Sequence, residues 1–300
     1  MSNLRLIFNG DDYGRTPGIN EAIIQAHTRG VLTSASLMVT GDAVDDAVRR
    51  ARAHPTLAVG LHLVVLDARG ALAPHQVPRL LDAQGRLLKD PFLAGVRYFF
   101  SADVRAELRR EMVAQFERFL DTGLGLAHVD GHYLMHLHPT VFTLLLPLAE
   151  QYGAAGIRLP RDDLALTLAL DRGGLSSKLT FASVYALLCR LALRRLRRSR
   201  IVYTDRVYGL LQTGRMHEPF VVGLLRRIPR AVRSAELYFH PSTDSLGEPY
   251  GPNPGDLAAL LSPCVRQAVG ERGAQLTHYA ALGASELGST PCPGHSSSSS

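Results

Sequence analysis

The stretch LRLIFNGDDYG, residues 4–14, shows the pattern on which the fold prediction rests. Its first half is apolar and typical of a β-strand, and the strand pattern ends in Asn-Gly followed by two aspartates. Adjacent carboxylates repel each other, so Asp11 and Asp12 together are costly unless a cation or a proton lies between them. An ordinary polar turn, which also favours Asp and Gly, is the simpler alternative.

Strand-like runs of this kind alternate with helical patterns along the chain. The further strand-like runs are 34–39, 57–65, 125–131, 155–160, 200–205 and 235–241. Helices are expected at 18–29 after Pro17, 42–53 behind a cap at Asp42, 102–121 capped by Ser101, 139–151 opening on Pro139, 216–228 and 254–271. Strict alternation implies parallel strands joined by crossovers, and seven or eight such units predict an α/β fold, an open or distorted (β/α) barrel.

Length and composition favour one large domain, expected over residues 1–283. The chain has 300 residues, 46% of them hydrophobic, and no linker interrupts the alternating pattern. The small, polar segment 284–300 is expected to be disordered. No run is long and apolar enough to cross a membrane, and no leader peptide is recognisable at the N-terminus.

The distribution of charge bears on the kind of partner, and the cysteines bear on the kind of metal site and on the cellular location. The net charge of +6 is concentrated between Arg190 and Arg200, which suggests a local anionic partner or a solvated helix and no nucleic-acid ligand. The three cysteines, Cys189, Cys264 and Cys292, contain no C-x-x-C pair, which argues against a disulfide framework and a thiolate zinc site. A cytoplasmic location fits this cysteine usage best.

Polar and ionisable residues follow most of the predicted strands. In a (β/α) barrel the carboxyl ends of the strands meet at one rim, so these residues are expected to converge on one site. The residues are Asp11, Asp12, His62, Asp130, His132, Arg158, Asp205 and His240. His62 taken alone would be interpreted as a buried, hydrogen-bonded histidine.

Four histidines crowd the stretch HVDGHYLMHLHP, residues 128–139. His132 and His136 are four residues apart and would share a helical face, but Pro139 suggests that the helix starts later and that 131–138 form a loop. Some of the four, which include His128 and His138, are therefore expected to contact substrate or to support other site residues.

The combination of strand-end residues indicates a metal centre. One carboxylate and two imidazoles from separate strand ends leave coordination positions open for water, as in a catalytic site. A bound cation lowers the pKa of water to roughly 7, the second aspartate is then free to act as general base, and His240 is the natural proton donor. This ligand type does not distinguish zinc and magnesium from manganese and cobalt.

The motifs FNGDDYG, GLHL, HVDGH…H.HP and ELYFHP, in this order across residues 4–282, resemble the YdjC family of carbohydrate deacetylases. The resemblance implies a distorted (β/α) barrel of the glycoside hydrolase/deacetylase type and removal of acetyl groups from N-acetylated sugars with one divalent metal ion. It makes Asp12, His62 and His132 the metal ligands, Asp11 the general base and His240 the general acid. Asp130 and His128 would support the site, Arg158 would contact substrate or hold a carboxylate, and His136 stays a candidate ligand.

Residues 161–200 form a long insertion between two predicted strands. Its second half places Phe181, Tyr185 and Leu188 at helical spacing before a run of arginines, as in an ordinary barrel helix with a basic end. Alternatively it is an amphipathic lid that contacts an anionic membrane through 178–200 and admits a lipid tail. The insertion resembles YdjC family members associated with hopanoid biosynthesis, which implies N-acetylglucosamine linked to a hopanoid lipid as substrate and a location at the inner face of the membrane.

Other functions are compatible with the same residues. Chitooligosaccharide is the more general deacetylase substrate. A metal-dependent phosphoesterase also uses Asp and His at strand ends, although it usually assembles two metals. A nonenzymatic lipid- or polyanion-binding protein would need only the basic stretch. A second copy of the same chain, in a homodimer, is a further possible partner.

Overall fold

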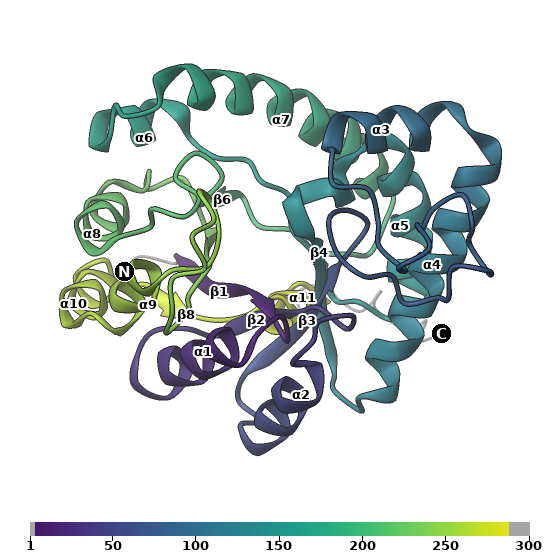
Figure 1. The fold of residues 1–300 in the computed structure, drawn as a ribbon. Helices are drawn as coiled ribbons and strands as arrows, with labels where there is room; N and C mark the ends of the chain where they lie inside the picture. The colour runs from purple at the N-terminus through teal and green to yellow at the C-terminus, as the bar shows by residue number, and fades with distance from the viewer. Residues whose placement is uncertain (1–3, 288–300) are drawn as a thin grey trace, which may run out of the picture.

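The computed structural model describes residues 4–287, and its strands form one curled parallel sheet (Figure 1). The strand order is β5-β4-β3-β2-β1-β7-β6, and the short β8 pairs with β1. Among the described residues, the ends of the sheet meet through one isolated parallel bridge, between Gly156 and Val202. The predicted distorted (β/α) barrel is therefore confirmed. The strands are β1 (Arg5–Tyr13), β2 (Ser34–Leu37), β3 (Ala58–Leu63), β4 (Leu126–Gly131), β5 (Gly156–Ile157), β6 (Arg206–Tyr208), β7 (Ser234–Phe239) and β8 (Gln275–Leu276).

Helices surround the sheet (Figure 1). Several begin as the sequence predicts: Pro17 opens α1, Pro139 opens α5, and the hydroxyl of Ser101 accepts a hydrogen bond from the Val104 amide at the start of α4. The helices are α1 (Pro17–Arg29), α2 (Val44–Ala53), α3 (Pro91–Phe100), α4 (Ala102–Asp121), α5 (Pro139–Gln151), α6 (Leu164–Leu170), α7 (Leu175–Leu196), α8 (Glu218–Arg227), α9 (Pro254–Leu261), α10 (Pro263–Glu271) and α11 (Tyr279–Leu287), with a 3-10 segment, η1 (His132–Leu137), before α5.

Two predicted helix boundaries are wrong. Asp42 does not cap α2, because that helix starts at Val44 and its N-cap residue makes no side-chain hydrogen bond. The predicted helix 254–271 divides at Ser262, whose hydroxyl caps α10, and Pro263 cannot continue the hydrogen bonding of α9. The segment expected to be disordered from residue 284 begins inside α11, which ends at Leu287, and residues 288–300 lie outside the described part of the chain.

The predicted strand 200–205 is displaced along the chain. Only Val202 makes a sheet contact in that range, and β6 starts at Arg206. Asp205 consequently lies at the amino end of the strand, where its carboxylate accepts hydrogen bonds from the backbone amides of Arg233 and Ser234. Asp205 is therefore at the rim opposite to the one predicted, and it takes no part in the site.

The apolar core lies between the sheet and the helices. Leu6 and Phe8 of β1, Leu61 of β3 and Leu237 of β7 are fully buried. The long connection from β3 to α4 is held against α4 by hydrogen bonds. The carboxylate of Glu111 on α4 accepts them from the backbone amides of residues 71 and 72. Within residues 4–287, no helix combines the length and apolarity needed to cross a membrane.

Candidate active site at the carboxyl ends of the strands

Asp12, His62 and His132 converge from β1, β3 and the turn after β4. Oδ1 of Asp12 lies 3.1 Å from Nδ1 of His132 and 3.4 Å from Nε2 of His62, and one ligand atom from each residue lies within 4.8 Å of the others. Oδ1 of Asp12 is buried and has no hydrogen-bond partner among residues 4–287. One carboxylate oxygen and two imidazole nitrogens that face a common point fit a divalent cation.

An unusual backbone conformation lets both aspartates reach this site. Successive residues of a strand normally point to opposite faces. Asp12 has φ of 61°, in the left-handed region, and the pairing of β1 with β2 is irregular between Gly10 and Tyr13. Tyr133 and Leu134, directly after His132, also have positive φ values, 53° and 54°. Such strained non-glycine residues are concentrated at functional sites.

The His62 ring is oriented by Asp130. Nδ1 of His62 lies 2.8 Å from Oδ1 of Asp130, which leaves Nε2 directed toward Asp12. This is the carboxylate–histidine arrangement that supports metal ligands. Burial lowers the pKa of His62, but the carboxylates of Asp130, Asp12 and Asp11 outweigh it and raise the pKa to about 10. The site therefore attracts positive charge.

Arg158 lies beneath the cluster and is fully buried. Its guanidinium donates two hydrogen bonds of 2.7 Å to the carboxylate of Asp11 and contacts Asp130 at 2.8 Å and Glu236 at 2.7 Å. It also stacks 4.5 Å from the ring centre of Tyr238. Despite burial, the Arg158 and His62 charges hold the pKa of Asp130 well below its usual range. Arg158 thus holds the carboxylates in place, one of the two roles expected for it.

A second set of metal-ligand atoms, from Asp11, His62 and Asp130, also lies within 4.8 Å. The Arg158 guanidinium already neutralises both carboxylates of this set. The fixed positive charge of Arg158 would repel a cation placed there. The set that includes Asp12 and His132 is therefore the better candidate for a metal centre.

Asp11 and His240 flank the candidate metal position. Oδ2 of Asp11 lies 3.9 Å from Nε2 of His240, and Asn9 donates a hydrogen bond to Oδ1 of Asp11. The backbone amide of His240 donates to the buried carboxylate of Asp256, which fixes the start of the loop after β7. Both side chains, together with the three candidate ligands, line one cavity of about 250 Å³.

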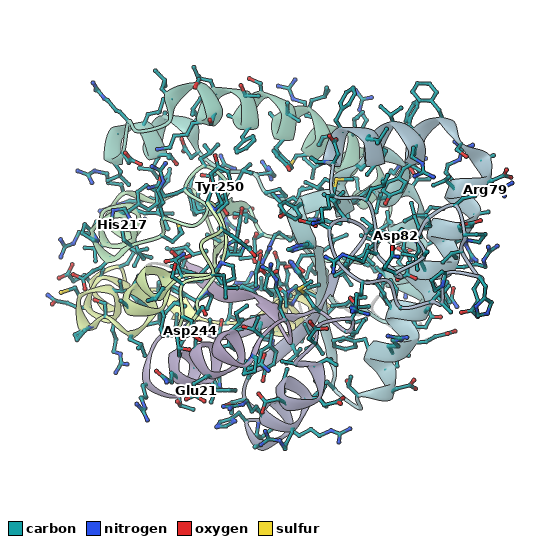
Figure 2. The ribbon with its side chains drawn as sticks, viewed as in Figure 1. Glu21, Arg79, Asp82, His217, Asp244 and Tyr250 are labelled. Atoms are coloured by element: carbon teal, nitrogen blue, oxygen red, sulfur yellow. The ribbon has the colours of Figure 1, made fainter. Side chains whose placement is uncertain are left out.

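The rest of this cavity comes from loops and from α7. Its walls include apolar and aromatic side chains of η1, α7 and the loops after β6 and β7, and Tyr250, labelled in Figure 2, belongs to the loop before α9. Arg15 links the candidate ligand Asp12 to the loop after β7, because its guanidinium lies 3.3 Å from the carboxylate of Asp12 and 2.5 Å from that of Glu248. The remaining lining residues are Gly131, Tyr133, Leu134, Phe181, Tyr185, Leu210, Thr213, Tyr238, Pro249 and Gly251.

The other histidines of the 128–139 stretch lie outside the cavity lining. Nε2 of His128 lies 3.0 Å from the Ser36 hydroxyl, which donates to Asp130, so His128 supports the cluster from behind. Nε2 of His136 donates to the backbone carbonyl of Arg158 at 3.0 Å. His138 packs against Tyr98 of α3, away from the cluster, so the site contact expected for it is wrong.

Several site residues were not anticipated from the sequence. Glu236 and Tyr238 face the cluster from β7, Ser36 from β2 and Asn9 from β1, and the Tyr279 hydroxyl donates to Glu236 at 2.5 Å. Glu236, Tyr238 and His240 alternate along one strand, and side chains two residues apart share a face. This spacing in AELYFHP is the signal that could have identified the first two.

The fold and the cluster together define an α/β barrel protein with a candidate metal centre at the carboxyl ends of its strands. Residues 5–271 match the family model described as YdjC-like protein. The chain belongs to the YdjC-like family.

About half of the chain is similar to curated relatives. The chain is 43% identical over 149 residues to a carbohydrate deacetylase of Brevibacillus brevis and 40% identical over 147 residues to one of Geobacillus stearothermophilus. These matches cover 50% and 49% of this chain, and the chain spans only 57% and 56% of the length of these relatives.

Among solved structures, an Enterococcus faecalis protein described provisionally as a cellobiose-phosphate cleavage protein superimposes with a TM-score of 0.73 at 25% identity, over 94% of this chain and 99% of that one. An uncharacterized Agrobacterium tumefaciens protein shares the fold at a TM-score of 0.51 and 13% identity, over 94% and 90% of the two chains.

Proposed function

We propose that this protein is a metal-dependent hydrolase that removes the acetyl group from an N-acetylated amino sugar. The observation that carries the proposal is the convergence of Asp12, His62 and His132 on one point, with Asp11 and His240 in the same cavity. The curated relatives named carbohydrate deacetylases support the choice of reaction.

Each side chain has a role in this reaction that its position permits. A divalent cation, zinc or magnesium with manganese or cobalt as alternatives, would polarise the acetyl carbonyl and lower the pKa of water to roughly 7. Asp11, whose orientation Arg158 fixes, would take the proton of the attacking water through Oδ2. His240 would donate a proton from Nε2 to the departing nitrogen. Acetate and a free amino sugar would be released.

The cavity walls favour a substrate with an apolar group beyond the sugar. Leu134, Phe181, Tyr185 and Leu210 line the pocket near the cluster. A neighbouring cavity of about 540 Å³ shares Tyr185 and Leu210 and continues along α7, past Ala186, Cys189 and Leu193. Its lining also includes the charged residues Arg161, Asp162, Asp163, Arg190 and Arg206. Together with the resemblance of the 161–200 insertion to hopanoid-associated family members, these apolar walls support N-acetylglucosamine linked to a hopanoid lipid as the first candidate substrate. The half-exposed rings of Tyr133 and Tyr250 at the pocket would suit stacking on sugar rings, which keeps chitooligosaccharide as the second candidate.

We further propose that residues 1–283 act as one catalytic unit in which 161–200 form a lid. Phe181 and Tyr185 of this segment line the pocket, which supports the lid assignment. A lipid-linked substrate would place the protein in the cytoplasm at the inner face of the membrane, with peripheral contact through 178–200.

Acetate release tests the activity and separates the candidates. The metal-stripped protein is incubated with N-acetylglucosaminyl lipid, with a chitooligosaccharide and with a phosphate monoester, before and after metal addition. The proposal expects metal-dependent acetate release, fastest on the lipid-linked sugar, and none from the Asp12→Ala variant. Phosphate release in place of acetate would establish a phosphoesterase, and vesicle binding without any hydrolysis would establish a nonenzymatic lipid-binding protein.

A further inference from the structure

Two helices carry most of the large apolar side chains that are exposed in the described part of the chain. On α3, Phe92 and Phe100 are 80% and 77% exposed, and on α7, Leu187 is 58% exposed. Both helices pack against α5, and they lie along the same edge of the molecule (Figure 1). The exposed residues are Phe92, Leu93, Val96, Phe99 and Phe100 on α3, and Leu175, Leu179, Val184, Leu187 and Leu191 on α7.

The apolar side chains on the outer face of α7 are not needed to pack the helix onto the barrel. Its inner face already packs on the barrel through Cys189, Ala192 and Leu196 and lines the candidate active site through Phe181 and Tyr185. A barrel helix needs only one apolar face. The outer leucines nevertheless continue at helical spacing, Leu175, Leu179, Leu187 and Leu191, and leave the helix apolar on two sides.

The apolar side chains on the exposed face of α3 likewise have no packing partner that folding requires. Only Ala94 and Tyr98 of this helix are buried, and the Tyr98 hydroxyl donates to the carbonyl of Val65. Its phenyl rings project outward, and those of Phe99 and Phe100 pack on each other 5.0 Å apart. Exposed apolar patches of this kind mark interaction surfaces.

The charge at the end of α7 indicates the kind of partner. Six exposed arginines lie in the last turns of α7 and directly after it: Arg190, Arg194, Arg195, Arg197, Arg198 and Arg200. The sequence from 173 to 200 contains no acidic residue, and no ion pair within residues 4–287 involves these arginines. Apolar side chains bordered by unpaired arginines match the surface of an anionic bilayer. Two copies that met through this face would bring both arginine clusters together, which disfavours self-association.

We propose that α3 and the outer face of α7 form a docking surface for a bilayer of anionic phospholipid. The surface extends the contact proposed for 178–200 to a second helix, distant in sequence. Since the inner face of α7 is a wall of the pocket, docking would bring that wall to the lipid headgroups. The link to substrate access rests on the proposed deacetylase function, but docking itself does not depend on catalysis.

Vesicle flotation of the full chain tests the docking surface. Vesicles of phosphatidylcholine with phosphatidylglycerol are compared with vesicles of phosphatidylcholine alone. The wild-type chain is expected to float only with the anionic vesicles. Replacement of Arg194, Arg195 and Arg198 by Gln should weaken binding roughly a hundredfold, given the contribution of each charge near the surface. Replacement of Phe92, Phe99 and Phe100 by Ser should weaken it roughly tenfold or more.

Matched variants keep the test specific. Leu120→Ser with Leu276→Ser removes exposed apolar side chains elsewhere, and Arg227→Gln with Arg230→Gln and Arg233→Gln removes equal charge near the end of α8. Both controls should bind like wild type. Circular dichroism melting identifies any variant that fails to fold, and single substitutions Phe92→Ser and Arg194→Gln then replace it.

The outcomes separate docking from catalysis. Asp11→Asn should float like wild type even if it is inactive, and the docking variants should hydrolyse a soluble N-acetylated substrate like wild type. Wild-type protein that ignores anionic vesicles overturns the docking surface whatever its activity. Equal binding by the arginine and control variants also overturns it. A homodimer in sedimentation that the Phe92, Phe99 and Phe100 replacements dissociate, without vesicle binding, would assign the face to self-association.

Discussion

Oδ1 of Asp130 lies 2.8 Å from Nδ1 of His62, on the side of the imidazole opposite to Asp12. This contact fixes which nitrogen of His62 faces the candidate metal position. A carboxylate in this position also makes the imidazole a stronger ligand. The candidate metal site therefore depends on a residue that would not itself touch the ion.

Asp130→Asn is expected to weaken metal affinity about 10- to 100-fold, because the amide cannot match the carboxylate's effect on His62. Isothermal titration of the metal-free protein measures this change. The substitution also removes one partner of Arg158, so the midpoint of thermal unfolding is recorded in parallel. Wild-type metal affinity in a folded Asp130→Asn variant would contradict the role given to this contact.

Asp11→Asn is expected to retain metal affinity and to lose roughly two or more orders of magnitude in turnover, as for removal of a general base. Asn keeps one acceptor oxygen for Arg158 but sets its amide NH2 against a second donor, so thermal unfolding is recorded in parallel to show that the variant is folded. Steady-state acetate release and metal titration are measured on the same preparation. Full turnover would transfer the base to another residue, of which His240 and Asp130 are nearest.

His240→Gln should affect substrates according to their leaving group. An amine leaves only after protonation, whereas a nitrophenolate needs no proton donor. Turnover of the N-acetylated sugar should therefore fall about 100-fold or more, while hydrolysis of nitrophenyl acetate should change little. An equal loss on both substrates would mean that His240 positions the substrate or the water.

Arg158→Met is expected to destabilise the fold by about 3 to 5 kcal/mol, because it leaves the carboxylates of Asp11, Asp130 and Glu236 buried without their cation. Denaturant unfolding of the metal-free protein measures the loss. Met keeps much of the side-chain volume, so lost packing contributes little. If the variant were as stable as wild type, the charge compensation assigned to Arg158 would be wrong.

His136 should make stability depend on pH. Burial lowers its pKa to about 4 from an ordinary value of 6.5, so protons bind the unfolded chain in preference to the folded one between these values. This contribution is fully present above pH 6.5 and is lost as the pH falls to about 4, by about 3 kcal/mol. The free energy of unfolding is compared at several pH values for wild type and His136→Gln, which should lack this component. Identical pH dependence would contradict it.

The alternation of strands and helices in the sequence was enough to predict the barrel. Parallel strands bring their carboxyl ends to one rim, so the residues at the strand ends could be predicted to share one cavity. These residues are Asp11, Asp12, His62 and His240. The bend at Asp12 could not be predicted, since a positive φ at Asp depends on tertiary contacts. α3 was missed because its exposed phenyl rings do not follow the pattern of a helix with one buried face. Asp205 was misplaced because local β-propensity does not fix where β6 starts.

Anomalous diffraction from crystals soaked in zinc or manganese tests the metal site most directly. We predict one strong peak per chain, in contact with Oδ1 of Asp12, Nε2 of His62 and Nδ1 of His132, at roughly 2.0 to 2.2 Å for zinc. The peak should be absent from the His132→Ala variant. A peak among Asp11, His62 and Asp130 with Arg158 displaced would contradict the ligand set of Asp12, His62 and His132. The absence of a peak at this rim under metal-replete conditions would also contradict it.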